Sequence, residues 1–161
     1  MSRAGAAKQP RAGDAEGGLR TGLLHQAFGH LFRRSHLRSQ QAFARAFDGS
    51  ALSPLQFGIL ELVLLNPGIT HGALAEGMVT APSVVTTAMK PLHSAGFLVE
   101  QTPAGDARRC GYRLSPSGEA FFAGLRERIL EAEELLLAPL SAAERRSLKR
   151  LLQRLAASGR L

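Results

Sequence analysis

The sequence predicts a mainly α-helical protein with one small β-hairpin. Three patterns lead to this fold class: amphipathic helical spacing near both ends of the chain, two short helices joined by a glycine-containing turn, and a strand-turn-strand pattern directly after them. The chain has 161 residues, of which 45% are hydrophobic and 20% charged, which is enough for about one domain with its own core.

The N-terminal region divides into an arm and a helix. Residues 1–18 lack a periodic pattern and are rich in Gly and Ala, so we expect a disordered basic arm. Residues 19–47 repeat apolar side chains mostly at steps of three and four, which predicts one long amphipathic helix. The repeating apolar residues are Leu24, Phe28, Leu31, Phe32, Phe43 and Phe47.

The next helix is marked by its start signals. Residues 53–56 (Ser-Pro-Leu-Gln) supply an N-cap serine, a proline at the first helical position and a glutamine three residues after the cap. They predict a helix that runs to about residue 65, where a turn over residues 66–68 follows.

Two further short helices are predicted close together. Thr70 can cap a helix over residues 71–76, which Gly77 ends. A second capped helix begins at residues 80–82 and runs to about residue 95. Two short helices joined by a tight turn form the outline of a helix-turn-helix, in which the second helix enters the major groove of DNA.

The C-terminal half begins with the hairpin. Residues 97–102 and 110–114 are strand-like and flank a basic turn, and a long helix is predicted over residues 116–137. Residues 141–144 form a capping box that starts the last helix. The expected apolar stripes are Phe121, Phe122, Leu125 and Ile129 on the long helix, and Leu148, Leu151, Leu152 and Leu155 on the last one.

The charge balance predicts a polyanionic partner. Twenty Lys and Arg against thirteen Asp and Glu leave a formal net charge of +7, which suits a nucleic acid or a membrane surface. No apolar stretch is long enough to span a membrane, and the N-terminal residues lack the apolar run of a signal peptide, so we expect a cytoplasmic protein. The single cysteine, Cys110, agrees with a reducing compartment.

The order of these elements resembles the MarR family of winged helix-turn-helix regulators over about residues 19–155. The matching motifs are residues 52–57 (Leu-Ser-Pro-Leu-Gln-Phe), 82–86 (Pro-Ser-Val-Val-Thr), 96–99 (Gly-Phe-Leu-Val), and 106–109 (Asp-Ala-Arg-Arg) followed by 113–118 (Arg-Leu-Ser-Pro-Ser-Gly). The last pair is the most specific, because it is similar to the family's acid-x-arginine-arginine wing and Leu-Thr-x-x-Gly exit.

The resemblance implies a homodimer that binds double-stranded DNA. Residues 19–47 and 116–161 would form the dimerisation helices, and residues 48–115 the winged DNA-binding lobe. The sequence supports the dimer independently, because apolar stripes at both ends of a small chain need a partner surface. The alternative is that these end helices pack on each other within one chain.

The predicted second helix of the helix-turn-helix has two unlike sides. Its buried side is expected to carry Val85, Ala88, Met89 and Leu92, and its DNA side Ser83, Thr86, Thr87 and Lys90. Hydroxyls near a helix start can reach base edges or phosphates, although Ser83 and Thr86 can equally serve only to cap or solvate the helix. Many family members carry arginine at the position of Thr87, so their base preference does not carry over, and Pro91 predicts a bend.

The hairpin tip is the predicted wing. Arg108 and Arg109 would enter a narrow minor groove, and Asp106 would orient an arginine through a charge-assisted pair. A solvated basic loop is the alternative.

The resemblance also implies control by a small molecule bound between the dimer helices and the DNA-binding lobe. The expected ligand-binding residues are Phe28, Phe32, Arg33, His36, Phe57 and Leu60. Arginines beside aromatic rings suit an anionic aromatic ligand or its acyl-CoA thioester, which would release a repressor from a pseudo-palindromic operator. The aromatic residues can equally be ordinary core, and the arginines can face DNA phosphates.

The sequence also bears on other functional classes, namely enzymes, metal-binding proteins and redox regulators. The chain has no G-x-S-x-G elbow, no glycine-rich phosphate loop with Lys and no H-E-x-x-H motif, so we expect no enzyme activity and no cofactor. The histidines are too scattered to predict a metal site. Two alternatives stay open: a winged-helix module that binds only proteins, and a redox regulator in which Arg109 lowers the pKa of Cys110.

Overall fold

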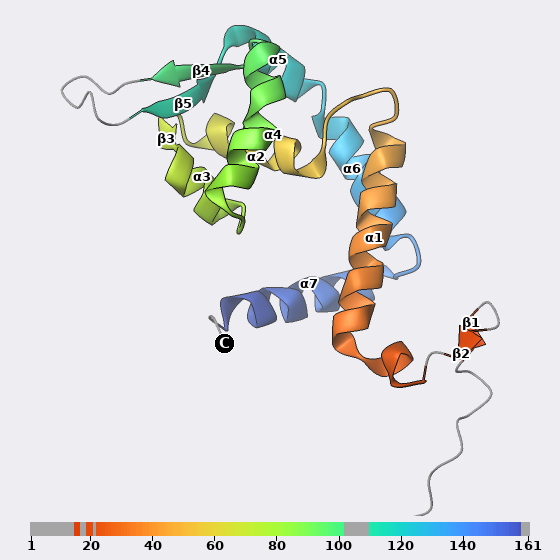
Figure 1. The fold of residues 1–161 in the computed structure, drawn as a ribbon. Helices are drawn as coiled ribbons and strands as arrows, with labels where there is room; N and C mark the ends of the chain where they lie inside the picture. Colours follow the sequence, from red (N-terminus) through yellow and green to blue (C-terminus); the bar gives the residue numbers. More distant parts are fainter. Residues whose placement is uncertain (1–14, 17–18, 21, 102–109, 159–161) are drawn as a thin grey trace, which may run out of the picture. The chain divides into compact units, whose positions relative to one another are not determined.

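The computed structural model describes residues 15–16, 19–20, 22–101 and 110–158 (Figure 1). The chain forms two compact units, residues 1–39 and 40–161. The predicted fold class is confirmed, because the described residues are mainly helical with a small antiparallel sheet. None of the helices in the described ranges is long and apolar enough to cross a membrane.

The first unit begins with short elements. Strands β1 (Ala15–Glu16) and β2 (Leu19–Arg20) pair antiparallel, and a 3-10 helix η1 (Gly22–Gln26) follows. The α-helix α1 (Phe28–Ala46) therefore starts later than the predicted residue 19. Gly22, at the start of η1, has a φ of +54°, a left-handed conformation that separates it from any regular α-helix through residue 19. Of the predicted disordered arm, residues 1–14 and 17–18 lie outside the described residues.

The second unit begins within α1, at residue 40, and contains the remaining elements. They are α2 (Pro54–Leu65), β3 (Ile69–Thr70), α3 (His71–Gly77), α4 (Pro82–Ser94), β4 (Leu98–Gln101), β5 (Gly111–Leu114), α5 (Pro116–Ala123), α6 (Arg126–Leu137) and α7 (Ala142–Ala157). The predicted start signals at α2 and α7 are confirmed, since Ser53 with Gln56 and Ser141 with Glu144 both form capping boxes.

The sheet has the order β3-β5-β4, and both pairings are antiparallel. The β4-β5 hairpin was predicted, but the two-residue strand β3 was not. It pairs Ile69 with Tyr112 and Thr70 with Gly111. A side chain at Gly111 would collide with the Gly68 main chain, so glycine is required for this close approach.

Two helix predictions need correction. The helix expected over residues 116–137 is divided into α5 and α6 at Gly124 and Leu125, whose N–H groups bond to carbonyls only three residues back. Glycine is a weak helix former, so the chain interrupts the helix there. The capping residue before α4 is Ala81, which makes no side-chain cap, and the left-handed turn residue is Val79 rather than Gly77.

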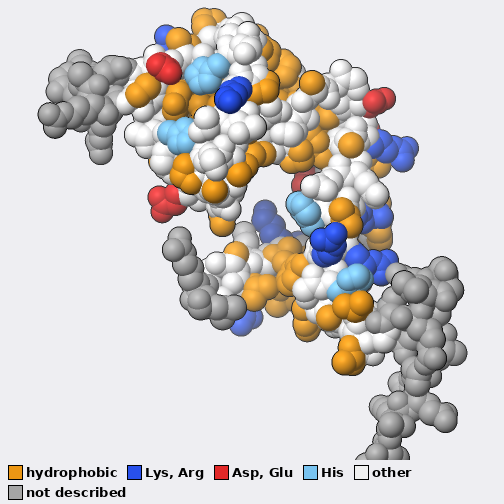
Figure 2. Space-filling model, in the orientation of Figure 1, with side chains coloured by type: hydrophobic (Ala, Val, Ile, Leu, Met, Phe, Trp, Pro, Cys, Tyr) orange, Lys and Arg blue, Asp and Glu red, His pale blue; other side chains and the backbone are white. Residues whose placement is uncertain are grey.

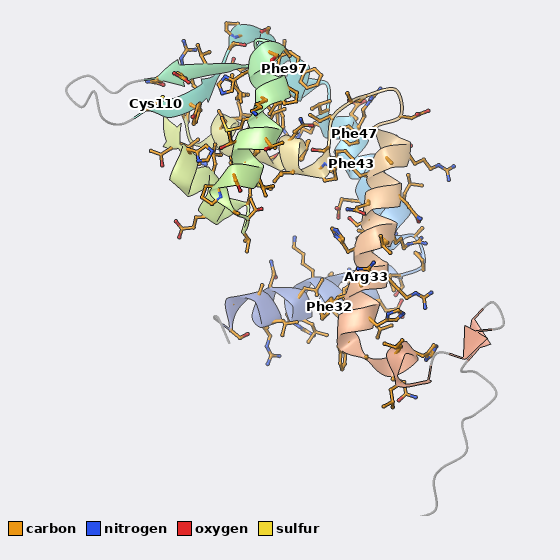
Figure 3. The ribbon with its side chains drawn as sticks, viewed as in Figure 1. Phe32, Arg33, Phe43, Phe47, Phe97 and Cys110 are labelled. Atoms are coloured by element: carbon orange, nitrogen blue, oxygen red, sulfur yellow. The ribbon has the colours of Figure 1, made fainter. Side chains whose placement is uncertain are left out.

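Aromatic side chains fill the core between α1, α2 and α5. Phe43 and Phe47, at the C-terminal end of α1, stack with ring centroids 4.0 Å apart (Figure 3). Phe57 meets Phe47 edge to face at 6.2 Å and stacks on Phe122 at 5.3 Å. This packing holds the end of α1 against α2 and α5.

Candidate nucleic-acid interface

Helix α4 has one buried and one exposed side, as predicted. Val85, Met89 and Leu92 are at most 3% exposed, which anchors the helix in the core. The predicted polar residues Ser83, Thr86, Thr87 and Lys90 are all exposed. Helix α3 precedes α4 through a short turn, so the pair forms a helix-turn-helix. The helix continues through Pro91 for three more residues, and the expected bend stays a prediction.

The hydroxyl groups of Thr86 and Thr87 are already hydrogen-bonded within the protein. The Oγ1 of Thr86 lies 3.1 Å from the carbonyl oxygen of Pro82 and 3.0 Å from Nε2 of His71. Thr87 donates to the carbonyl oxygen of Ser83 at 3.1 Å. Each threonine hydroxyl thus lies within hydrogen-bond distance of a main-chain carbonyl oxygen one turn earlier in α4.

A surface hollow of about 490 Å³ lies beside this face of α4. Its lining residues are His71, Thr86, Met89, Lys90, His93, Ser94 and Tyr112. Figure 2 shows histidine and basic side chains gathered over this part of the molecule. The rings of His93 and Tyr112 meet edge to face with centroids 5.6 Å apart. Imidazole and ammonium groups beside a recognition helix suit a phosphate or another anion.

Sequence analysis missed two contributors to this surface, His71 and His93. Nothing in the local sequence links either histidine to the helix-turn-helix. Their positions in the sequence could have indicated this surface. His71 is the first residue after the Thr70 cap, and His93 lies one turn after Met89 on α4.

The predicted wing residues Asp106, Arg108 and Arg109 lie outside the described residues. The strands that lead to them are in place, as β4 and β5 pair from Leu98–Leu114 to Gln101–Gly111. Their roles in DNA contact and arginine orientation stay predictions.

Cys110 lies at the base of the wing, next to Glu100 of β4. Desolvation raises the pKa of its thiol, and the charge of Glu100 and a hydrogen bond with it raise the pKa further. The redox alternative expects Arg109 to lower this pKa, and because Arg109 lies outside the described residues, that effect stays a prediction.

The six predicted ligand-binding residues differ in exposure. Phe28 is 78% and Phe32 44% exposed on α1, where Arg33 and His36 are exposed too (Figure 3). Neither Phe28 nor Phe32 belongs to the buried cluster of the described residues, and their role in ligand binding stays a prediction. In the second unit, Phe57 belongs to the aromatic core and Leu60 is fully buried.

Comparisons with known proteins connect this geometry to transcriptional regulators. No family model matches the chain. A transcriptional regulatory protein assigned to the hcr operon of Thauera aromatica is 29% identical over 135 residues, which cover 83% of this chain and 81% of that protein. The repressor CouR, solved on a 23-mer DNA duplex, has a TM-score of 0.79 and 24% identity, covering 86% of this chain and 98% of CouR. CouR has also been solved with p-coumaroyl-CoA.

A MarR family protein of Mycobacterium tuberculosis, solved with salicylic acid, has a TM-score of 0.65 and 23% identity, covering 80% of this chain and 96% of that protein. This chain has a MarR-type winged-helix fold. In this MarR-type fold, α3 and α4 are the helix-turn-helix, and β4 and β5 are the strands of the wing.

Proposed function

We propose that this protein is a MarR-type transcriptional regulator that binds double-stranded DNA sequence-specifically and acts without catalysis or a cofactor. The exposed hydroxyl and ammonium side of α4 carries the proposal. Because its opposite side is buried, this helix is held rigidly with four polar side chains toward solvent. CouR, which has the same fold, is a repressor that has been solved on DNA.

In this proposal, different charged residues contact different parts of the DNA. Lys90 and the hollow beside it would receive a backbone phosphate, while the N-terminal turn of α4 lies in the major groove. Arg108 and Arg109 would reach the neighbouring minor groove, with Asp106 orienting an arginine. The formal net charge of +7 would favour encounter with DNA.

The active species in this proposal is a homodimer. Within the described ranges, apolar side chains stay exposed on η1 and α1 and on α7. Those on the N-terminal elements are Leu23, Leu24, Phe28, Leu31 and Phe32, and those on α7 are Leu148, Leu151, Leu152 and Leu155. Single-chain proteins rarely leave such stripes in water, and a second copy supplies an equivalent apolar surface.

The proposed control is release of a repressor by an anionic aromatic molecule or its acyl-CoA thioester. Arg33 and His36 are exposed on α1, where His36 lies one turn after Phe32 and Arg33 directly follows Phe32. Guanidinium groups bind carboxylates and phosphates through paired hydrogen bonds, and exposed rings supply the apolar contact. Such a ligand acts only by binding the free and DNA-bound states unequally.

The test of DNA binding is a titration of the purified protein into labelled DNA from the region upstream of its own gene, at two salt concentrations. Binding that resists scrambled competitor DNA and weakens steeply with salt is expected, because phosphate contacts release counterions. Lys90→Ala should weaken binding and reduce the salt slope. Arg154→Ala, on α7, is the matched control that removes an exposed charge away from α4.

The outcomes separate the alternatives. Salt-resistant association with a protein, in the absence of any DNA binding, would identify a protein-interaction module instead. Adding salicylate, p-coumarate and p-coumaroyl-CoA to the preformed DNA complex tests the effector. Release that Arg33→Ala abolishes supports the proposed control, whereas no release by any of them contradicts this choice of ligand class.

A further inference from the structure

The hydroxyl of Thr86 has a constrained hydrogen-bonding state. Its oxygen lies within hydrogen-bond distance of both the Pro82 carbonyl and His71 Nε2, although the side chain is exposed. A hydroxyl has one proton to donate. The carbonyl oxygen of Pro82 can only accept, whereas Nε2 of His71 donates or accepts according to its tautomer.

Both tautomers of His71 keep the Thr86 hydroxyl proton within the protein. If Nε2 carries a proton, His71 donates to Thr86, and the Thr86 hydroxyl donates to Pro82. If Nε2 is unprotonated, it accepts the Thr86 proton itself. In each case the hydroxyl proton stays within the protein, so Thr86 has no donor left for a base or phosphate. The groups left for DNA are the methyl group and an oxygen lone pair.

Building on the proposed DNA-binding function, we propose that His71 is a positioning residue that holds Thr86 so that α4 recognises thymine through its 5-methyl group. In the major groove, guanine presents only acceptors at N7 and O6, and adenine N7 also needs a donor. A threonine without a free proton satisfies none of these acceptors, and its remaining lone pair can only accept from adenine N6 or cytosine N4. Its methyl group does make a favourable contact with the methyl of thymine.

The location of this pair supports a role in recognition rather than in folding. His71 is the first residue of α3, and Thr86 lies in the N-terminal half of α4. Their contact therefore crosses the helix-turn-helix at the end of α4 that enters the groove in such motifs. Both side chains line the surface hollow and neither is buried, so the contact adds little to the core.

The first experiment selects a preferred duplex from random DNA and then replaces single thymines by deoxyuridine, which lacks only the methyl group. We expect at least one thymine in each half-site whose replacement weakens binding of the wild-type protein about fourfold, the value of burying one methyl group. Replacing thymines outside the half-sites is the control. Because the protein is unchanged, no folding defect can produce this effect.

Variants of Thr86 assign the effect to its methyl group. Thr86→Ser keeps the hydroxyl and removes the methyl, so the preference for thymine over deoxyuridine should fall to about one. Thr86→Val removes the hydroxyl but carries a methyl on both branches of Cβ, so one methyl faces the base without help from His71 and the preference should remain. Thr87→Ser is the comparison variant, because it deletes the same group one position along α4. A preference that depends on Thr87 and not on Thr86 overturns the assignment.

Variants of His71 test the positioning role. His71→Phe keeps a ring but cannot bond to Thr86, and it should reduce the thymine preference. His71→Gln retains a side-chain N–H donor and should restore it, an outcome that general destabilisation would not give. An unchanged preference in His71→Phe overturns the role of His71.

The experiments distinguish a failure of thymine-methyl recognition from a failure of the proposed DNA-binding function. A duplex that is selected and bound, but is insensitive to deoxyuridine, overturns the methyl recognition and leaves the DNA-binding function intact. If no duplex is enriched and DNA does not bind, both are overturned.

Discussion

The side-chain amide of Gln56 on α2 donates a hydrogen bond to the carbonyl oxygen of Ala88 in α4, with 3.1 Å between the two atoms. The Oε1 atom of the same side chain accepts from the main-chain N–H of Ser53 at 2.8 Å. Gln56 is only 8% exposed. One buried side chain therefore both starts α2 and holds the proposed DNA-reading helix.

Gln56→Glu should destabilise the protein in a pH-dependent way. A carboxylate can still accept from Ser53, but it cannot donate to Ala88 and would place a charge beside a carbonyl oxygen. We expect a loss of about 1–3 kcal/mol in the free energy of unfolding at pH 7. The charged form is disfavoured in the folded state, so the pKa of the new carboxyl is raised there and part of the loss is regained as the pH falls.

Urea denaturation at neutral and mildly acidic pH measures this difference. Gln40→Glu, at an exposed position of α1, is the matched control and should change stability little. A deficit in Gln56→Glu that does not shrink on acidification would mean that the Ala88 contact is not the cause.

Val79→Asn should stabilise the turn between α3 and α4. Val79 has a φ of +49°, which is strained for a β-branched residue, and its side chain is 92% exposed. Asparagine adopts this conformation more readily, and little apolar contact is lost, so we expect a gain of about 1 kcal/mol. Thermal denaturation should show a higher Tm. Val79→Thr keeps the branching at Cβ and should not stabilise; an equal gain there would exclude backbone strain as the source.

Cys110 should react slowly with thiol reagents at neutral pH. Desolvation and Glu100 raise the pKa of its thiol, so the reactive thiolate fraction is smaller than in a free cysteine. Glu100→Gln removes the negative charge, and we expect alkylation at pH 7 to become faster and its pH midpoint to move down. If the rate with Glu100 present already matches that of a model thiol, the carboxylate does not control this group.

Leu155→Ser should weaken the proposed dimer. Leu155 is 58% exposed on α7, and a polar replacement removes apolar area that a partner would cover. Sedimentation over a range of concentrations should show a larger monomer fraction, while the helical circular dichroism signal is retained. Lys149→Ser, on the same helix, is expected to leave assembly unchanged. Equal effects of the two variants would argue against an apolar α7 interface.

The start signals of helices could be predicted because they act within four residues. Ser53 with Gln56, and Ser141 with Glu144, satisfy main-chain groups that every helix start leaves unpaired. The apolar spacing of α4 likewise placed Val85, Met89 and Leu92 in the core and left its polar residues exposed. Local hydrogen bonding and helical periodicity therefore predicted from the sequence alone where α2 and α7 begin and which side of α4 is buried.

Tertiary structure decided the features that join distant residues. Strand β3 is too short to have a pattern of its own and exists because β5 supplies its hydrogen bonds. The bond of His71 to Thr86 spans 15 positions, and that of Gln56 to Ala88 spans 32. The exposure of Phe28 could not be predicted from the sequence either. An apolar helical stripe has the same residue spacing whether its own chain or a partner chain covers it. Composition and spacing thus determined which segments are helical, whereas packing decided which side chains meet and which stay uncovered.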